Sequence, residues 1–157
     1  MKVYKITDLK EFTTQLFVGE TFDNFLLTEA YIATAYTTTI DGRIAAPAEG
    51  DEEFVPWQSV KPVAMQLIRG KQLPRSFRIV FKLSTDNMAR TLSAMKLDDQ
   101  APTVAGLYIN IRYEEQELTF TTGASRTTFT TDREVESGWD QMGARFLAAH
   151  HVSFDEL

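Results

Sequence analysis

Positively charged side chains are concentrated in one stretch of the sequence, residues 54–85. This stretch holds six of the sixteen Lys and Arg residues and no Asp or Glu, although the whole chain has a net charge of −6. Guanidinium groups bind carboxylates and phosphates through paired hydrogen bonds, and ammonium groups bind them as point charges. We call residues 54–85 the basic segment. Its candidate ligands for an anionic partner are Arg69, Lys71, Arg75 and Arg78.

A purely structural role for these cations is the alternative interpretation. Gly70 is typical of a helix end, so Arg69 and Lys71 are expected at the negative end of a helix dipole. Arg78 and Lys82 alternate with apolar residues, which predicts that they line the wet face of a strand. No aromatic residue alternates with these cations on the predicted outer face. The sequence therefore does not indicate a platform on which single-stranded nucleic acid could stack.

Residue types that perform catalysis are present without the spacing that catalysis requires. His150 and His151 are adjacent, so on a helix they point in different directions and are poor joint ligands for one metal. Ser125 has Thr127 two positions later, where the nucleophile elbow requires glycine. The sequence predicts no catalytic residue, no metal ligand and no cofactor.

Pairs of acidic residues are explained by turns. Asp98-Asp99 falls in a polar linker and Glu114-Glu115 in a hairpin, so both are expected to be solvated and not to form a general acid–base pair. The sequence also lacks the glycine-rich loops that bind phosphate. Trp57 is expected in the core, and ligand stacking by its ring is the alternative.

Length and composition limit the kind of protein that this can be. A chain of 157 residues without cysteine predicts a single domain that needs no disulfide. Residues 1–10 lack the apolar core of a signal peptide, and no apolar run is long enough to cross a membrane. We expect a cytoplasmic protein that does not bind membranes. Its partner, a protein or an anionic ligand, and its oligomeric state are not indicated.

The hydrophobic pattern predicts an α+β fold with a mostly antiparallel sheet, about four helices and roughly seven to nine strands. Helices are expected to begin near Thr7, Ser59 and Ser84, and near Thr131, where Thr131 and Glu134 would form a capping box. The expected strands are residues 2–6, 29–40, 77–83, 104–113, 117–122 and 127–131. A hairpin is predicted at Asp41-Gly42, and a tight turn at residues 123–126.

Two parts of the chain resemble each other. The run Val3-Tyr4-Lys5-Ile6-Thr7 matches Val80-Phe81-Lys82-Leu83-Ser84 in residue type, and a helix and Thr-rich strands are expected after each. This predicts pseudo-repeats at residues 1–44 and 76–131, joined by a helical segment at 54–75 and followed by a C-terminal helix at 132–149. A chance match between two amphipathic units is the alternative.

Several segments resemble a small bacterial family of unknown function found mainly in Gram-positive anaerobes. They are residues 1–6, 19–27, 67–74, 104–113 and 121–130, with Trp139-Asp140 after them. This resemblance implies one compact domain and no particular activity. The repeated order of strand, helix and strands is also similar to half of a DNA sliding clamp. The helix at 8–18 and the helix from Asp86 are not basic, however, and a clamp half has no place for the central and C-terminal helices.

Three functional hypotheses follow. The first is a binding module without enzymatic activity, which holds an anionic partner through residues 61–82. The second is a clamp-like accessory protein that assembles through the edges of its sheet. The third is an enzyme whose site is assembled from residues scattered along the chain.

Overall fold

One seven-stranded antiparallel sheet carries the fold, with the strand order β3-β2-β4-β5-β6-β1-β7. It is seen in a computed structural model that describes residues 1–68 and 74–157. The strands are β1 (Val3–Ile6), β2 (Leu26–Ala33), β3 (Thr37–Asp41), β4 (Ser76–Lys82), β5 (Val104–Glu114), β6 (Glu117–Arg126) and β7 (Phe154–Glu156). The helices are α1 (Leu9–Phe17), α2 (Trp57–Leu67), α3 (Thr85–Ala94), a short 3-10 helix (Asp98–Thr103) and α4 (Glu134–Ala149). The predicted α+β class is confirmed.

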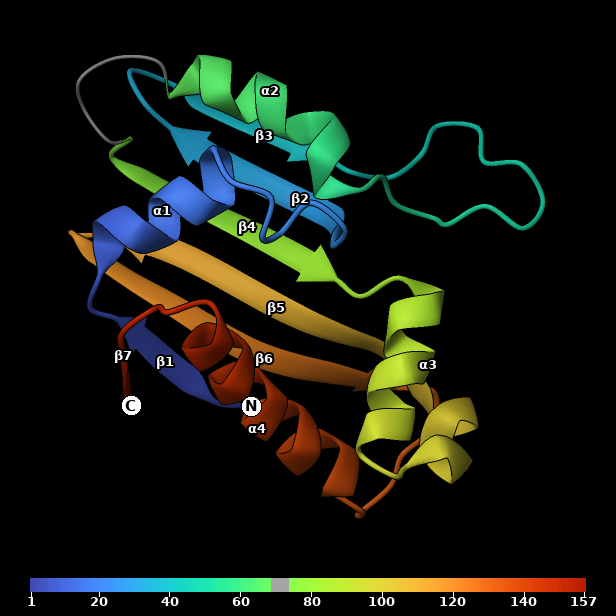
Figure 1. The fold of residues 1–157 in the computed structure, drawn as a ribbon. Helices are drawn as coiled ribbons and strands as arrows, with labels where there is room; N and C mark the ends of the chain where they lie inside the picture. Colours follow the sequence, from blue (N-terminus) through green and yellow to red (C-terminus); the bar gives the residue numbers. More distant parts are fainter. Residues whose placement is uncertain (69–73) are drawn as a thin grey trace.

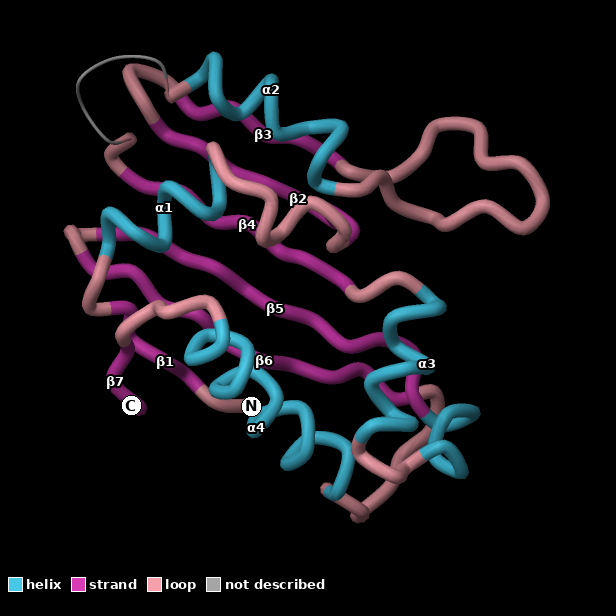
Figure 2. The backbone as a smooth tube through the Cα atoms, viewed as in Figure 1, coloured by secondary structure: helices cyan, strands magenta, loops and turns pink. Residues whose placement is uncertain are grey.

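The helices are distributed unequally over the sheet. Helices α1, α2 and α4 lie on one face, and α3 with the 3-10 helix lies at one end (Figure 1). The same arrangement is seen in the backbone trace, where the strands run behind the helices (Figure 2). In the described part of the chain, no helix covers the opposite face. We call that opposite surface the open face.

Alternation along the strands places the core under the helices. On β4, Phe77, Ile79 and Phe81 are buried, whereas Arg78 and Lys82 between and beyond them are half-buried. This is the pattern of an antiparallel sheet with one packed face and one wet face. Of the expected core, Leu67 and Phe146 are half-buried against it. The others are buried: Phe12, Leu16, Phe81, Leu92, Leu107, Ile109, Ile111, Phe120 and Trp139.

The predicted hairpin at Asp41-Gly42 is wrong. The expected strand 29–40 is broken at Thr34, whose N–H donates to Tyr36 O, so that β2 and β3 pair with each other there. A Cβ on Gly42 would lie 1.8 Å from Leu27 O. Glycine is therefore required at this position by the close approach of two backbones, which produces the same sequence signal as a turn.

Four further local predictions are wrong. Residues 123–126 continue β6 because Gly123 pairs in register with Tyr108, and residues 127–131 form no strand. Helix α2 begins at Trp57 after Pro56, which places Pro62 inside the helix. The Glu134 N–H is capped by Asp132 Oδ1 at 2.8 Å, so the capping box with Thr131 does not form. The expected start of α3 near Ser84 is confirmed, and Ser84 Oγ caps the helix by accepting a hydrogen bond from Asn87 N–H.

The element order of the two proposed repeats is the same, since β1-α1-β2-β3 and β4-α3-β5-β6 both read strand, helix, strand, strand. Their pairing differs. Strand β4 pairs with β5, the strand that follows its helix, whereas β1 pairs with β6 and β7. The duplication and the domain limits stay predictions.

Candidate functional site

The cations of the basic segment lie on different sides of the sheet. Lys61 of α2 is on the helix-covered side, where its Nζ donates to Asp23 Oδ1 at 2.6 Å and to Gly19 O at 2.7 Å. Both side chains are largely buried. The Gly19 carbonyl follows the C-terminus of α1, so Lys61 neutralises a buried carboxylate and a helix end together. Its role is structural.

The four candidate ligands are only partly described. Arg69 and Lys71 lie outside the described residues. Arg75 is exposed just before β4, and its backbone N–H donates to Ala33 O. Arg78 lies on the open face of β4, where its Nη2 pairs with Glu29 Oε1 at 2.8 Å. The structure thus places Arg78 among outward-facing side chains of other strands.

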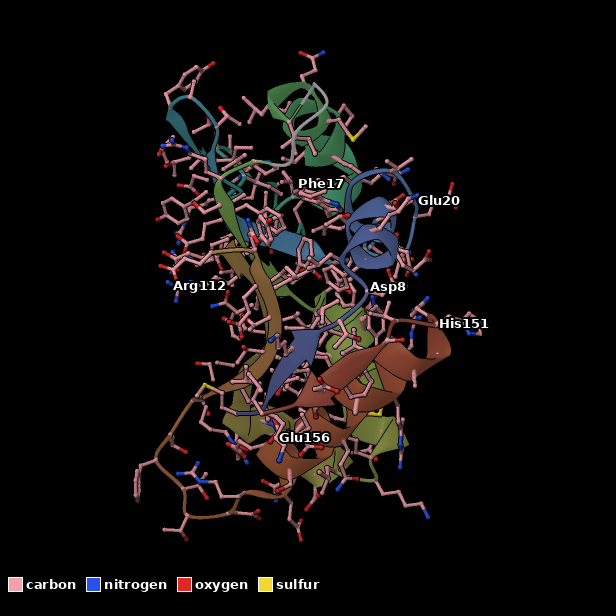
Figure 3. The ribbon with its side chains drawn as sticks, turned by 90° about the vertical axis from the view of Figure 1, so that its left-hand side faces the viewer. Asp8, Phe17, Glu20, Arg112, His151 and Glu156 are labelled. Carbon is pink, nitrogen blue, oxygen red and sulfur yellow. The ribbon has the colours of Figure 1, made fainter. Side chains whose placement is uncertain are left out.

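A row of side chains crosses the open face in register with Arg78. Opposite Arg78 on β5 is Arg112, and the row continues through Thr119 on β6 to Lys5 on β1. On the other side of Arg78 the row continues to Tyr31 and Thr39. The only acid in the row is Asp155, on the edge strand β7. Viewed along the sheet, Arg112 projects away from the helices, on the side opposite Asp8 and His151 (Figure 3). We call Lys5, Arg78 and Arg112 the cationic row.

Arg78 and Arg112 form a like-charged pair. Directly opposite residues of antiparallel strands have Cα atoms roughly 4.5–5.5 Å apart, and like charges there are destabilising. Each guanidinium has an acidic neighbour, Glu29 for Arg78 and Glu114 for Arg112. The side chains of the Arg78–Glu29 pair are 41% and 40% exposed, and those of the Arg112–Glu114 pair are 62% and 51% exposed. Exposed ion pairs contribute only about 0–1 kcal/mol, so an incoming anion can replace either acid.

Aromatic rings stand beside the cations of the open face. The Arg78 guanidinium lies 4.6 Å from the Tyr31 ring centroid. Lys82 Nζ lies between two rings, 5.8 Å from Phe54 and 5.9 Å from Tyr108. Cation–π attraction acts within about 6 Å. Aromatic rings therefore lie beside the cations of this face in space, although none alternates with them along the outward face of β4. Tyr31 and Tyr108 belong to the neighbouring strands, and Phe54, the first residue of the basic segment, lies in the connection before α2, so alternation along β4 does not reveal these rings.

Three cavities lie along this face. One of about 380 Å³ is lined by Tyr31, Arg78 and Arg112 with Thr37, Ser76 and Glu114. A second of about 400 Å³ lies between Tyr31, Arg43 and Phe54. A third of about 300 Å³ surrounds Arg112 at the β5–β6 hairpin, with Glu114 and Glu117. Together they place the two arginines and two of the rings beside space that a ligand can enter.

A largely buried ion pair between Arg126 and Glu136 has a structural position. Arg126 at the end of β6 donates Nη2 to Glu136 Oε1 at 2.8 Å and Nε to Glu136 Oε2 at 3.1 Å. Its Nη1 donates to Thr103 Oγ1. The hydrogen bonds from Arg126 lower the pKa of Glu136 to about 2, from an ordinary value of 4.5. This pair fixes the first turn of α4 to the sheet and to the 3-10 helix.

The other residues considered for chemistry are dispersed. His150 ends α4 with its ring 4.5 Å from that of Phe146, and His151 is exposed. Ser125 lies in β6 and pairs with Gly106 of β5. Trp57 is fully buried and donates Nε1–H to Leu16 O. Among residues 1–68 and 74–157, no group of three or more His, Asp or Glu is arranged to hold a metal.

Sequence reasoning missed Lys5, Arg112, Tyr31 and Tyr108 as members of one surface. The signal was present, because each alternates with buried residues on its own strand. Assigning them to one row also requires the strand order, and β1 is seventy residues or more from β4 in sequence. Alternation alone does not supply that order.

The comparisons with known proteins identify the family. A family model described as a family of unknown function, DUF5721, matches residues 15–155. No curated protein matches the chain, and no solved structure matches it. None of the described helices combines the length and the apolar character needed to cross a membrane. Because the match spans most of the 157 residues, the chain belongs to DUF5721, a family of unknown function.

Proposed function

We propose that this protein is a binding module that holds an anionic partner on its open face, with the cationic row as the main contact. The observation that carries the proposal is the cross-strand register of Arg78 and Arg112 on a face that no described helix covers. Two adjacent guanidinium groups can each donate paired hydrogen bonds to a carboxylate or phosphate. An anion bridging them would also relieve their mutual repulsion.

The cationic row differs from the basic segment in composition. It retains Arg78 from the segment and adds Lys5 and Arg112, which lie far away in sequence. Within the described chain, Lys5 and Lys82 make no ion pair, so both ammonium groups are available to a partner. The net charge of −6 opposes polyanions at long range, but a local cationic surface can bind phosphate on an acidic protein.

Charge reversal tests this proposal. Arg112→Glu replaces an exposed side chain at the centre of the row, and we expect it to weaken retention on a phosphate or heparin matrix and to lower the salt concentration at elution. Lys10→Glu is the matched control, since Lys10 is an exposed cation of α1 on the helix-covered side. Equal retention of both variants and the unmodified protein would contradict the proposal, and circular dichroism would verify that each is folded.

Assembly through a sheet edge is the second candidate function, in line with the clamp-like hypothesis. Edge strand β3 carries Thr37, Thr38, Thr39 and Ile40, without the Lys or Pro that usually protects an edge. A second copy pairing antiparallel along β3 would extend the sheet through a two-fold interface. Light scattering across a range of concentrations tests it, and a strict monomer at every concentration removes it.

The enzyme hypothesis requires a pocket in which carboxylates or histidines converge. Among the three cavities of the open face, the one at the β5–β6 hairpin is most similar to such a pocket, because Glu114, Glu115 and Glu117 surround Arg112 there. The same arrangement is explained by the acidic hairpin turn, in which Glu115 and Gln116 both have positive φ. This hypothesis stays a prediction.

A further inference from the structure

We infer that the anionic partner is a single-stranded nucleic acid, with its phosphates on the cationic row and its bases on the rings of the open face. This inference rests on the proposed function and adds the class of the partner. It depends on the spatial relation of rings and cations, which the positions of Tyr31, Tyr108 and Phe54 in the sequence do not show.

The two tyrosines of the open face lie on the two strands that flank β4. Tyr31 of β2 lies opposite Arg78 of β4. Tyr108 of β5 lies opposite Lys82, on the other side of β4. Neighbouring strands are about 4.8 Å apart and residues on one face of a strand repeat at about 6.8 Å. The two tyrosines are thus separated by a distance that a few nucleotides can span. Proteins that bind single strands combine such a cationic track with aromatic platforms.

The rings remain partly accessible. Tyr31, Tyr108 and Phe54 are each half-buried, and two of the three cavities of the open face contain Tyr31. A Cβ on Gly106 would lie 2.8 Å from the Tyr108 ring and 3.0 Å from Lys82 Cε. The absence of a side chain at Gly106 therefore leaves room for Tyr108 and Lys82 to lie against the sheet. This packing holds both in place for a ligand.

An unsatisfied acceptor lies between a ring and a cation of the open face. Asn110 lies between Tyr108 and Arg112 on the open face of β5, and its buried Oδ1 has no hydrogen-bond partner among the described residues. Buried acceptors are almost always paired. Phosphate and carboxylate oxygens are acceptors and cannot pair with it, whereas bases and the backbone N–H groups of a polypeptide supply donors. Rotation of the amide toward a bound base would give it an amino or imino donor.

Duplex nucleic acid fits the same surface less well. In a duplex the base faces are stacked on each other, so only phosphates could reach the open face and the rings would contribute nothing. Single strands expose the faces of their bases to aromatic side chains. An acidic polypeptide would likewise use the cations but not the rings, and it is the competing class of partner.

The experiment measures binding of a labelled oligothymidylate of about ten nucleotides by fluorescence anisotropy at several salt concentrations, with poly-L-glutamate as a competitor. We expect Arg112→Glu to weaken binding and to lower the slope of log affinity against log salt by about 0.7 or more. Tyr108→Leu removes the aromatic ring but keeps an apolar side chain at this position of β5. We expect it to weaken binding about tenfold and to leave the slope of log affinity against log salt unchanged. Phe129→Leu, at a ring that is 90% exposed in the loop between β6 and α4, should have no effect.

The outcomes separate the inference that the partner is a single-stranded nucleic acid from the proposal that the open face binds an anionic partner. Loss of affinity in Tyr108→Leu but not in Phe129→Leu supports a single-stranded partner. If poly-L-glutamate displaces the oligonucleotide at equal charge concentration and Tyr108→Leu binds normally, the nucleic-acid inference is overturned while the anion-binding function stands. If neither polymer binds, or if Arg112→Glu changes nothing, the proposed function itself is wrong.

Discussion

Replacing Glu136 by Gln should lower the free energy of unfolding in a pH-dependent way. The carboxylate accepts two hydrogen bonds from Arg126, whose side chain is only 9% exposed, and its own side chain is 16% exposed. The pKa of Glu136 is about 2 in the folded chain against an ordinary 4.5. One pKa unit corresponds to about 1.4 kcal/mol, so the full shift sets an upper value of about 3 kcal/mol. Screening by the solvent that reaches the pair lowers the expected loss to about 1–2 kcal/mol.

The pH dependence follows from the direction of the shift. Because the folded pKa lies below the unfolded one, the stabilisation is fully present above pH 4.5 and is lost as the pH falls toward 2. Urea unfolding of the two proteins at pH 7 and at intervals down to pH 3 should show a difference that shrinks across this window. Glu53→Gln is the control, since its ion pair with Arg43 is more than half exposed. We expect a change below about 0.5 kcal/mol there. A Glu136→Gln deficit that is absent at pH 7, or constant with pH, would refute the reasoning.

Two further predictions concern stability. Lys61→Met leaves the buried Asp23 carboxylate without its partner, and chemical denaturation should show a loss of about 3 kcal/mol or more; a neutral result would mean that Asp23 is solvated without Lys61. Gly42→Ala places a methyl group against Leu27 O. Thermal unfolding should show a loss of about 1–3 kcal/mol or more in the free energy of unfolding. Gly123→Ala, where a Cβ meets nothing within 4 Å, is its control, and equal effects of the two substitutions would show that the close approach is not what requires glycine at position 42.

The fold class could be predicted from the sequence because alternation is a local property. On β4 and β5 the period of two separates Ile79 and Ile111 from Arg78 and Arg112 without knowledge of the tertiary structure. Chain reversals were less predictable. Gly42 was mistaken for a turn because glycine marks both turns and close backbone approaches, and only the contact with Leu27 distinguishes them.

The candidate site was predictable only in part. Arg78 was identified from the charge of the basic segment, and its outward direction from alternation. Its neighbours Arg112, Tyr31 and Lys5 come from three other strands, so finding them requires the strand order β2-β4-β5-β6-β1. Charge density along the sequence also grouped Lys61 with Arg78, although α2 and the open face lie on opposite sides of the sheet. Proximity in sequence was therefore a poor guide to a surface formed across strands.

The most direct test of the open face as the binding surface is an NMR titration that follows the Nε–Hε signals of the arginine side chains as oligothymidylate is added. We predict saturable shifts for Arg78 and Arg112, which face each other across β4 and β5. Arg90 of α3 and Arg145 of α4 are exposed cations outside this face and should not shift. Shifts confined to Arg90 and Arg145, or no saturable shift at Arg78 and Arg112, would contradict the account.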